Sequence, residues 1–220
     1  METNTTVSLR ADGVARLCLM MLCLASSSVS SAANNVLPEY ERVRVLSTAR
    51  PISEIELVDK SGSPFALREL RGRVVMVFFG FANCPDVCPT TMARLQQFKQ
   101  SAGKDLDDVV YAMISVDGER DTPEKLKKFV DGFSPEFIGL TGKPDLVKRV
   151  AAEFRAPFYK GNISGPSNAY SVAHAPQVFL LDADGMLRAE LYNASFEAMA
   201  GISKALLDEH QVSQQRTTAD

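Results

Sequence analysis

Residues 73–100 read RVVMVFFGFANCPDVCPTTMARLQQFKQ, and the architecture of the chain can be worked out from them. After Arg73 the run to Phe79 is apolar and rich in β-formers, which is typical of a central strand buried on both faces. Gly80 to Pro89 form a loop, and apolar residues then recur at helical spacing over 90–100. A buried strand that leads through a short loop into a helix predicts an α/β unit.

The segments around this unit extend it in both directions. Residues 52–58 alternate apolar and polar side chains, residues 59–62 form a turn, and Phe65 begins the return, which indicates a β-hairpin. Two short antiparallel segments flank the loop 161–167. Further strands are expected at 109–116, 137–140, 177–182 and 186–191, and helices at 123–130 (capped by Thr122), 144–154 and 195–210. We predict an α/β sandwich with a central mixed β-sheet, an N-terminal β-hairpin extension and flanking helices.

The composition excludes several classes of protein. With 45% hydrophobic and 23% charged residues, the chain is neither disordered throughout nor a polytopic membrane protein. A net charge of −3 without a basic stripe predicts that nucleic acid is not a partner.

The N-terminus has the pattern of a secretory signal. Arg10 and Arg16 precede the apolar run 17–25, and small residues follow it. We expect cleavage after Ala32, and a retained membrane anchor is the alternative, although the run is far shorter than the roughly 20 residues that span a bilayer. The protein is therefore expected to be exported, to the bacterial periplasm, where it is either free or tethered to the membrane.

These features divide the chain into four parts. Residues 1–32 are the secretory signal segment, and the polar residues 33–50 are expected to form a flexible arm or tether. Residues 51–210 form the folded domain, and residues 211–220 are expected to be a frayed tail.

Removal of the signal leaves only Cys84 and Cys88 as thiols, because Cys18 and Cys23 leave with it. In an oxidising compartment a lone pair of cysteines is expected to form a disulfide unless something else occupies it. Their place at a strand–helix junction exposes them to the helix dipole, which lowers thiol pKa values. A spacing of four puts both sulfurs on one side of a helical turn, where they can form a disulfide or hold a metal. A purely structural disulfide is the alternative, but so short a loop gains little stability from one.

Three further segments accompany the CPDVCP motif at 84–89: SVDGERDTPE at 115–124, YSVAH at 170–174 and FLLDADG at 179–185. In this order and spacing the set resembles the Sco/SenC family of exported, thioredoxin-like copper proteins. The resemblance extends from about Ile52 to His210 and implies a thioredoxin-like fold for residues 51–210.

The resemblance also implies a copper site made of Cys84, Cys88 and His174. Two thiolates and one imidazole form a soft ligand set that suits Cu(I) and can also hold Cu(II). His210 is the other available imidazole, but it lies at the end of a polar helix, where it favours the helix dipole. Met92 is a rival third ligand, although methionine at helical spacing more often fills a core.

Three acidic residues are candidates for a supporting role. The resemblance implies that Asp86, Asp117 and Asp121 either form a docking surface for a partner or influence the copper from a second layer. For Asp121 and for Asp86, helix capping is the alternative. The sequence departs from the family pattern at Asn83, Gly118 and Ala173, of which Ala173 replaces an acid beside the histidine. The Ala175–Pro176 peptide could be cis or trans.

The family resemblance predicts an exported copper metallochaperone that helps to assemble the copper site of a respiratory cytochrome c oxidase. Its expected partners are the copper-bearing subunit of the oxidase or another copper chaperone, together with a thiol reductant. The protein is expected to contact a membrane only by proximity or through a retained N-terminal anchor. The alternative is a thiol–disulfide oxidoreductase, with Cys84 and Cys88 as its redox pair, that reduces the cysteines of a partner's copper site. A peroxiredoxin-like peroxidase is disfavoured because no Thr-x-x-Cys arrangement is present.

Overall fold

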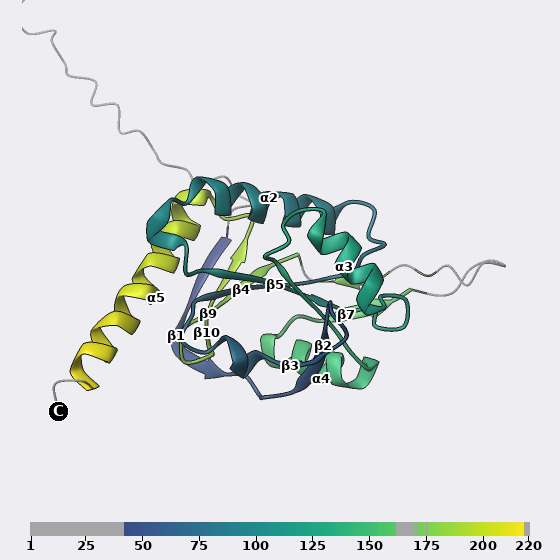
Figure 1. Cartoon of the computed structure of the whole chain (residues 1–220), viewed down its shortest axis with the longest axis horizontal. Coiled ribbons are helices and arrows are strands. Elements are labelled where there is room, and N and C mark those ends of the chain that lie inside the picture. The colour runs from purple at the N-terminus through teal and green to yellow at the C-terminus, as the bar shows by residue number, and fades with distance from the viewer. Residues whose placement is uncertain (1–41, 162–169, 171, 175, 218–220) are drawn as a thin grey trace, which may run out of the picture. The chain divides into compact units, whose positions relative to one another are not determined.

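The computed structural model describes residues 42–161, 170, 172–174 and 176–217 (Figure 1). Its centre is a mixed sheet of eight strands, which are β1 (Arg42–Pro51), β2 (Glu56–Asp59), β3 (Pro64–Ala66), β4 (Val75–Gly80), β5 (Val110–Ser115), β6 (Ile138–Thr141), β9 (Val178–Leu181) and β10 (Met186–Tyr192). A second sheet pairs β7 (Phe158–Lys160) with β8 (Val172–His174). The helices are α2 (Val87–Ser101), α3 (Pro123–Asp131), α4 (Pro144–Phe154) and α5 (Phe196–Thr217).

The strand order is β1-β10-β9-β4-β5-β6-β2-β3. Strands β4, β5 and β6 run parallel, whereas β9 is antiparallel to β4 and β2 is antiparallel to β6. The predicted α/β class with a mixed central sheet is therefore confirmed. The predicted hairpin is also present, as the antiparallel pair β2–β3.

The core lies on both faces of β4 and β5, whose residues are all buried. On one face, the ring of Phe79 lies 5.1 Å from that of Phe154 in α4. On the other face, Phe98 of α2 contacts Tyr111 of β5 at 6.4 Å and Phe196 of α5 at 5.7 Å, measured between ring centroids. Helix α4 thus covers one face of the sheet, and α2 and α5 cover the opposite face (Figure 1). This arrangement places the start of α2 beside the carboxyl end of β4.

Two expected boundaries are wrong at the ends of the domain. Residues 42–50, expected within the arm, belong to β1, which pairs antiparallel with β10 from Arg42↔Tyr192 to Pro51↔Met186. An edge strand needs no apolar core face, and Arg44 lies 3.4 Å from Glu190 across the pair. At the other end, α5 continues to Thr217 instead of ending near His210, because its last turns need only good helix formers and not buried ones.

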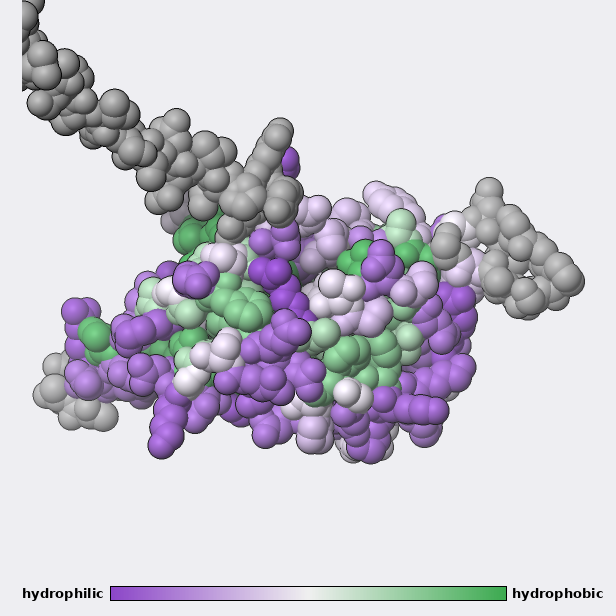
Figure 2. Space-filling view, turned by 90° about the horizontal axis from the view of Figure 1, so that it is seen from above, coloured by the Kyte–Doolittle hydropathy of each residue, from purple (hydrophilic) through white to green (hydrophobic). Residues whose placement is uncertain are grey.

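Several predictions concern residues outside the described part of the chain. They are the secretory signal at 1–32, the loop centred on 162–167 and the geometry of the Ala175–Pro176 peptide. Within the described part, no helix combines the length and the apolar character needed to cross a membrane. Figure 2 looks onto the side that carries α2 and shows a largely hydrophilic surface interrupted by separate hydrophobic patches.

Candidate metal centre

The two cysteines lie on either side of the start of α2. Cys84 is half-buried in the loop that follows β4, and Cys88 is fully buried in the first turn of the helix. The backbone N–H of Cys88 donates to the Cys84 sulfur at 3.4 Å. Pro89 also falls within this first turn, where backbone N–H groups have no partner inside the helix, so the helix can begin before it. The expectation that both cysteines lie in one helical turn is therefore wrong, because Cys88 is in the first turn of α2 and Cys84 precedes the helix.

Gly80, at the end of β4, makes room for the Cys88 sulfur. A Cβ atom at this position would lie 2.9 Å from the Cys88 Sγ and 2.6 Å from the Cε1 of Phe78. The next residue, Phe81, donates its backbone N–H to the Cys88 sulfur at 3.4 Å. The strand end thus holds the sulfur by a close approach that only glycine permits.

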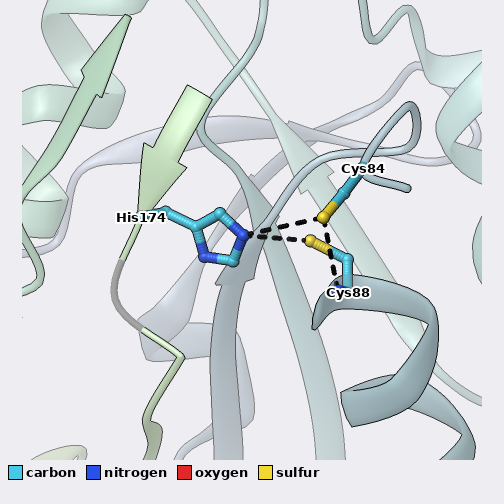
Figure 3. Close-up of side chains that lie close together, drawn as sticks. All are labelled: Cys84, Cys88 and His174. Atoms are coloured by element: carbon cyan, nitrogen blue, oxygen red, sulfur yellow. Dashed lines mark hydrogen bonds between the residues drawn. The ribbon is translucent and has the colours of Figure 1, made fainter. Parts of the chain in front are cut away.

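His174 reaches the cysteines from β8, where it pairs with Phe158 of β7. Its Nε2 lies 3.2 Å from the Cys88 Sγ and 4.0 Å from the Cys84 Sγ. Figure 3 shows the imidazole pointing toward both sulfurs. The rings of Phe78 and Phe81 pack against the imidazole in T-shaped geometry, with centroid separations of 5.7 and 5.8 Å. The ring is therefore oriented toward both sulfurs by aromatic side chains of β4 and of the loop after it.

The three side chains form a group with the dimensions of a metal site. One ligand atom from each of Cys84, Cys88 and His174 lies within 4.8 Å of the other two. Metal–sulfur and metal–nitrogen bonds of about 2.0–2.3 Å place two ligands of one ion roughly 3.5–4.6 Å apart. The 4.0 Å between Cys84 and His174 lies in this range, and the 3.2 Å between Cys88 and His174 needs to widen by only about 0.3 Å for the group to hold a single soft ion. Of the rival ligands, His210 is in α5 and outside this group, and Met92 is buried in the apolar core, as its helical spacing suggested.

Both cysteines are free thiols, and burial dominates the electrostatics of the deeper one. Burial raises the pKa of Cys88 far above its usual value, and the N–H of Phe81 offsets only part of this effect. The neighbouring Cys84 and the charge of Asp121 raise the pKa of Cys88 further. The pKa of this thiol is therefore raised and not lowered as expected, because the loss of solvation outweighs the hydrogen bond from Phe81. A bound cation would reverse the balance and favour the thiolate.

Asp121 holds the cysteine loop and does not cap a helix. Its Oδ2 accepts hydrogen bonds from the backbone N–H of Ala82 at 2.8 Å and from the hydroxyl of Ser115 at 2.6 Å. Burial raises the pKa of Asp121, against the lowering effect of these two donors. The cap of α3 is Thr122, as predicted, because its side chain accepts from the N–H of Lys125.

Asp117 is equally buried and joins two other side chains. Its carboxylate pairs with the guanidinium of Arg120 and accepts a hydrogen bond from the hydroxyl of Tyr170. Because Asp117 and Asp121 are both 0% exposed, neither offers a surface for a partner. Through these contacts both residues hold segments that surround the site, and their predicted influence on the copper stays a prediction. Asp86 differs from both, because its side chain is exposed.

The cysteine loop and the histidine face a surface hollow of about 570 Å³, whose wall includes Cys84, His174, Asp86 and two of the departures from the family pattern, Asn83 and Ala173. Both of these residues are exposed. The third departure, Gly118, is half-buried, and an added Cβ there would come 2.0 Å from the carbonyl oxygen of Gly142. The loop after β5 therefore packs more closely than proline at this position would allow.

Sequence reasoning missed three residues that build this centre. Ser115 and Arg120 stand inside the motif at 115–124, and Tyr170 begins the motif at 170–174, so the signal was present in the quoted stretches. The roles of Arg120 and Tyr170 depend on contacts between distant segments, such as the hydrogen bond from Arg120 to the carbonyl of Tyr170, 50 residues away. Ser115 instead contacts Asp121 within the same motif.

Comparisons with known proteins agree with this geometry. The SCO1/SenC family model matches residues 45–207, and the chain belongs to this family. A protein of Stutzerimonas stutzeri, described as a candidate copper-binding protein, is 34% identical over 175 residues, which cover 79% of this chain and 85% of that protein.

Two solved structures are similar over most of the described domain. Bradyrhizobium japonicum ScoI, solved with copper bound, is 31% identical, with a TM-score of 0.63 over 71% of this chain and 99% of that one. Yeast Sco1, also solved with copper bound, is 30% identical, with a TM-score of 0.61 over 66% of this chain and 80% of that one. The predicted family and the thioredoxin-like fold are thus confirmed.

Proposed function

We propose that this chain binds one copper ion through Cys84, Cys88 and His174 and delivers it during assembly of a respiratory cytochrome c oxidase. The observation that carries the proposal is the convergence of two sulfurs and one imidazole nitrogen within 4.8 Å of one another. These ligands come from a loop, a helix and a separate small sheet, and a soft, low-coordinate set of this kind suits Cu(I). The copper-bound relatives support the choice of ion.

The experiment is an anaerobic Cu(I) titration of the reduced full chain, in competition with a chromogenic chelator. Cys18 and Cys23 are replaced by serine throughout, so that only the two thiols of the site remain. We expect one copper per chain. His174→Ala should weaken copper binding by more than about tenfold, because even mutation of a residue that only orients a ligand lowers metal affinity by roughly 10- to 100-fold. His210→Ala is the matched control and should bind as the parent does. Equal affinity of the His174→Ala variant and the parent would remove His174 from the site.

The alternative function, reduction of the cysteines in a partner's copper site, is supported by the unequal exposure of the two thiols. Cys84 is half-buried and borders the hollow, whereas Cys88 is buried, an arrangement that suits attack by one thiol and resolution by the other. A Cys88→Ser variant incubated with an oxidised partner peptide distinguishes the two functions. Accumulation of a mixed disulfide with Cys84, together with turnover of the parent protein, would favour the reductase over the chaperone.

We also propose export of the mature protein, on the basis of the signal-like pattern at residues 1–32. Intact-mass measurement of the protein recovered from the periplasm tests this proposal. A chain that begins after Ala32 is the expected result, and a chain that keeps the apolar run would support the membrane-anchored alternative.

A further inference from the structure

His174 is carried by a sheet of only two strands, separate from the eight-stranded sheet that carries the cysteine loop. Its place relative to the sulfurs therefore depends on contacts between the β7–β8 hairpin and the rest of the domain. Tyr170, four residues before His174, makes several of these contacts. Its hydroxyl donates to the carboxylate of Asp117, and its backbone carbonyl accepts from the Nη1 of Arg120 at 3.0 Å.

Arg120 strengthens the same junction through its planar group. The guanidinium carbon lies 3.8 Å from the centroid of the Tyr170 ring, which is close enough for stacking and a cation–π interaction. The Nε of Arg120 is paired with the buried carboxylate of Asp117, so the guanidinium is held on both sides. Its side chain is 25% exposed, which leaves little solvent to screen these contacts.

The neighbouring strand of the hairpin is held by the same loop. Lys160, at the end of β7, forms an ion pair of 2.8 Å with Glu119, and its Nζ lies 4.9 Å from the Tyr170 ring centroid. The loop of residues 117–121 thus contacts β7 through Glu119 and the segment before β8 through Asp117 and Arg120.

The opposite side of this loop holds the cysteines. Asp121 accepts the backbone N–H of Ala82 at 2.8 Å, two residues before Cys84. One short loop therefore touches both halves of the site, with Asp121 on the cysteine side and Arg120 on the histidine side. A displacement at either contact would change the separation between the sulfurs and the imidazole.

We propose that Arg120 and Tyr170 are positioning residues that set where the His174 imidazole lies relative to the Cys88 sulfur. The inference rests on the proposed copper site and deepens it. The proposed ligands are Cys84, Cys88 and His174, and the contacts of Arg120 and Tyr170 lie at the base of the segment that carries His174, so both residues would act through this ligand. The planar guanidinium of Arg120 contacts the Asp117 carboxylate, the Tyr170 ring and the Tyr170 carbonyl at once. This shape, and not the positive charge alone, would fix the position of the segment that carries His174.

The test is a double-mutant cycle on Cu(I) affinity, measured on the reduced full chain with Cys18 and Cys23 replaced by serine. Arg120→Met and Tyr170→Phe are each made in the parent and in the His174→Ala background. We expect each to weaken copper binding by about three- to tenfold in the parent and by less than about twofold without His174, because a residue that acts only through His174 has nothing left to position. Arg188→Met and Tyr159→Phe are the matched controls. Arg188 forms ion pairs with Asp182 and Glu209, and Tyr159 is 69% exposed.

A second readout needs no metal. Hydrogen exchange at the amides of 172–174 should be faster in Arg120→Met and Tyr170→Phe than in the parent and the two controls, while the midpoint of thermal unfolding measures any global loss of stability. If Arg120→Met fails to fold, Tyr170→Phe, which removes a single hydroxyl, carries the test.

The outcomes separate this inference from the proposed function. Equal losses of affinity in both backgrounds, or no loss in the parent, would overturn the positioning role. Unchanged exchange at 172–174 in both variants would overturn it as well, as would full recovery of affinity in Arg120→Lys, which keeps the charge without the fork. If His174→Ala itself binds copper as the parent does, the proposed ligand set fails instead.

Discussion

The glycine at the end of β4 provides the sharpest test of how the site is built. Gly80→Ala adds a single methyl group, which would lie 2.6 Å from the Cε1 of Phe78, 2.9 Å from the Sγ of Cys88 and 3.2 Å from the Cε of Met113. All three neighbours are 0% exposed, so none can move aside into solvent. The added methyl therefore acts directly on the sulfur and on the ring that lies against His174.

The size of the effect follows from these distances. Non-bonded heavy atoms prefer separations of about 3.5–4.0 Å, so the Cys88 sulfur must retreat by roughly 0.6 Å or more and the Phe78 ring by roughly 0.9 Å or more. Overpacking of this kind costs about 1–3 kcal/mol of folding free energy. The same displacement disturbs the 3.2 Å approach of the His174 Nε2 to the sulfur. We expect copper affinity to fall together with stability.

Two measurements check this expectation. Urea unfolding of the copper-free protein gives the change in the free energy of unfolding, and chelator competition gives the change in Cu(I) affinity. Gly201→Ala is the control, because its Cβ would have no atom within 4 Å and it lies inside α5. Alanine there should stabilise the protein by up to about 1 kcal/mol and leave copper binding unchanged. If Gly80→Ala unfolds at the same urea concentration as the parent and binds copper equally well, the crowding argument is wrong.

Two further substitutions probe other contacts. Asp121→Ala removes the acceptor of the Ala82 amide and should lower the free energy of unfolding by about 1–3 kcal/mol and weaken Cu(I) binding; a variant with parental stability in urea would contradict this. Asp131→Asn tests pH dependence, since hydrogen bonds from Lys127 and Lys60 hold the pKa of Asp131 below 3.8. A carboxyl group whose pKa is lower in the folded state than in the unfolded state stabilises the fold at pH values above its unfolded pKa. This contribution is lost as the pH falls through its folded pKa. Parent and variant should therefore differ by at most about 1 kcal/mol at neutral pH and converge as the pH falls below 3.8 and through the lowered folded pKa, as followed by thermal unfolding over the acid range; a constant difference would refute the linkage.

The parts of the fold that the sequence predicts well are those set by local pattern. The apolar run in β4 has only one satisfactory environment, which is the middle of a sheet with both faces covered. Thr122 and Pro123 mark the start of α3 through capping chemistry that involves only neighbouring residues. In each case the physical cause lies within a few residues, so the sequence displays it.

The site was harder to predict, because its geometry arises from distant segments. The family motifs indicated Cys84, Cys88 and His174, but nothing in their spacing shows that burial raises the pKa of Cys88. That effect requires the sulfur to lie against the end of β4. The role of Asp121 likewise depends on the amide of Ala82, which lies 39 residues away in the chain. The sequence alone therefore could not distinguish this role from helix capping.

The three proposed ligands differ in how firmly the fold holds them, and this difference bears on the release of copper. Cys88 is fixed within the core at the start of a helix, whereas Cys84 lies in the loop beside the hollow and His174 belongs to the small sheet. Cys88 is 0% exposed, whereas Cys84 and His174 border the hollow. If the chain delivers copper as proposed, a partner's thiolate would therefore meet the ion beside Cys84, and Cys88, the least accessible ligand, would be the last to be replaced. A site with one buried and two adjustable ligands can hold copper securely and still transfer it in steps, each of which replaces one bond with another.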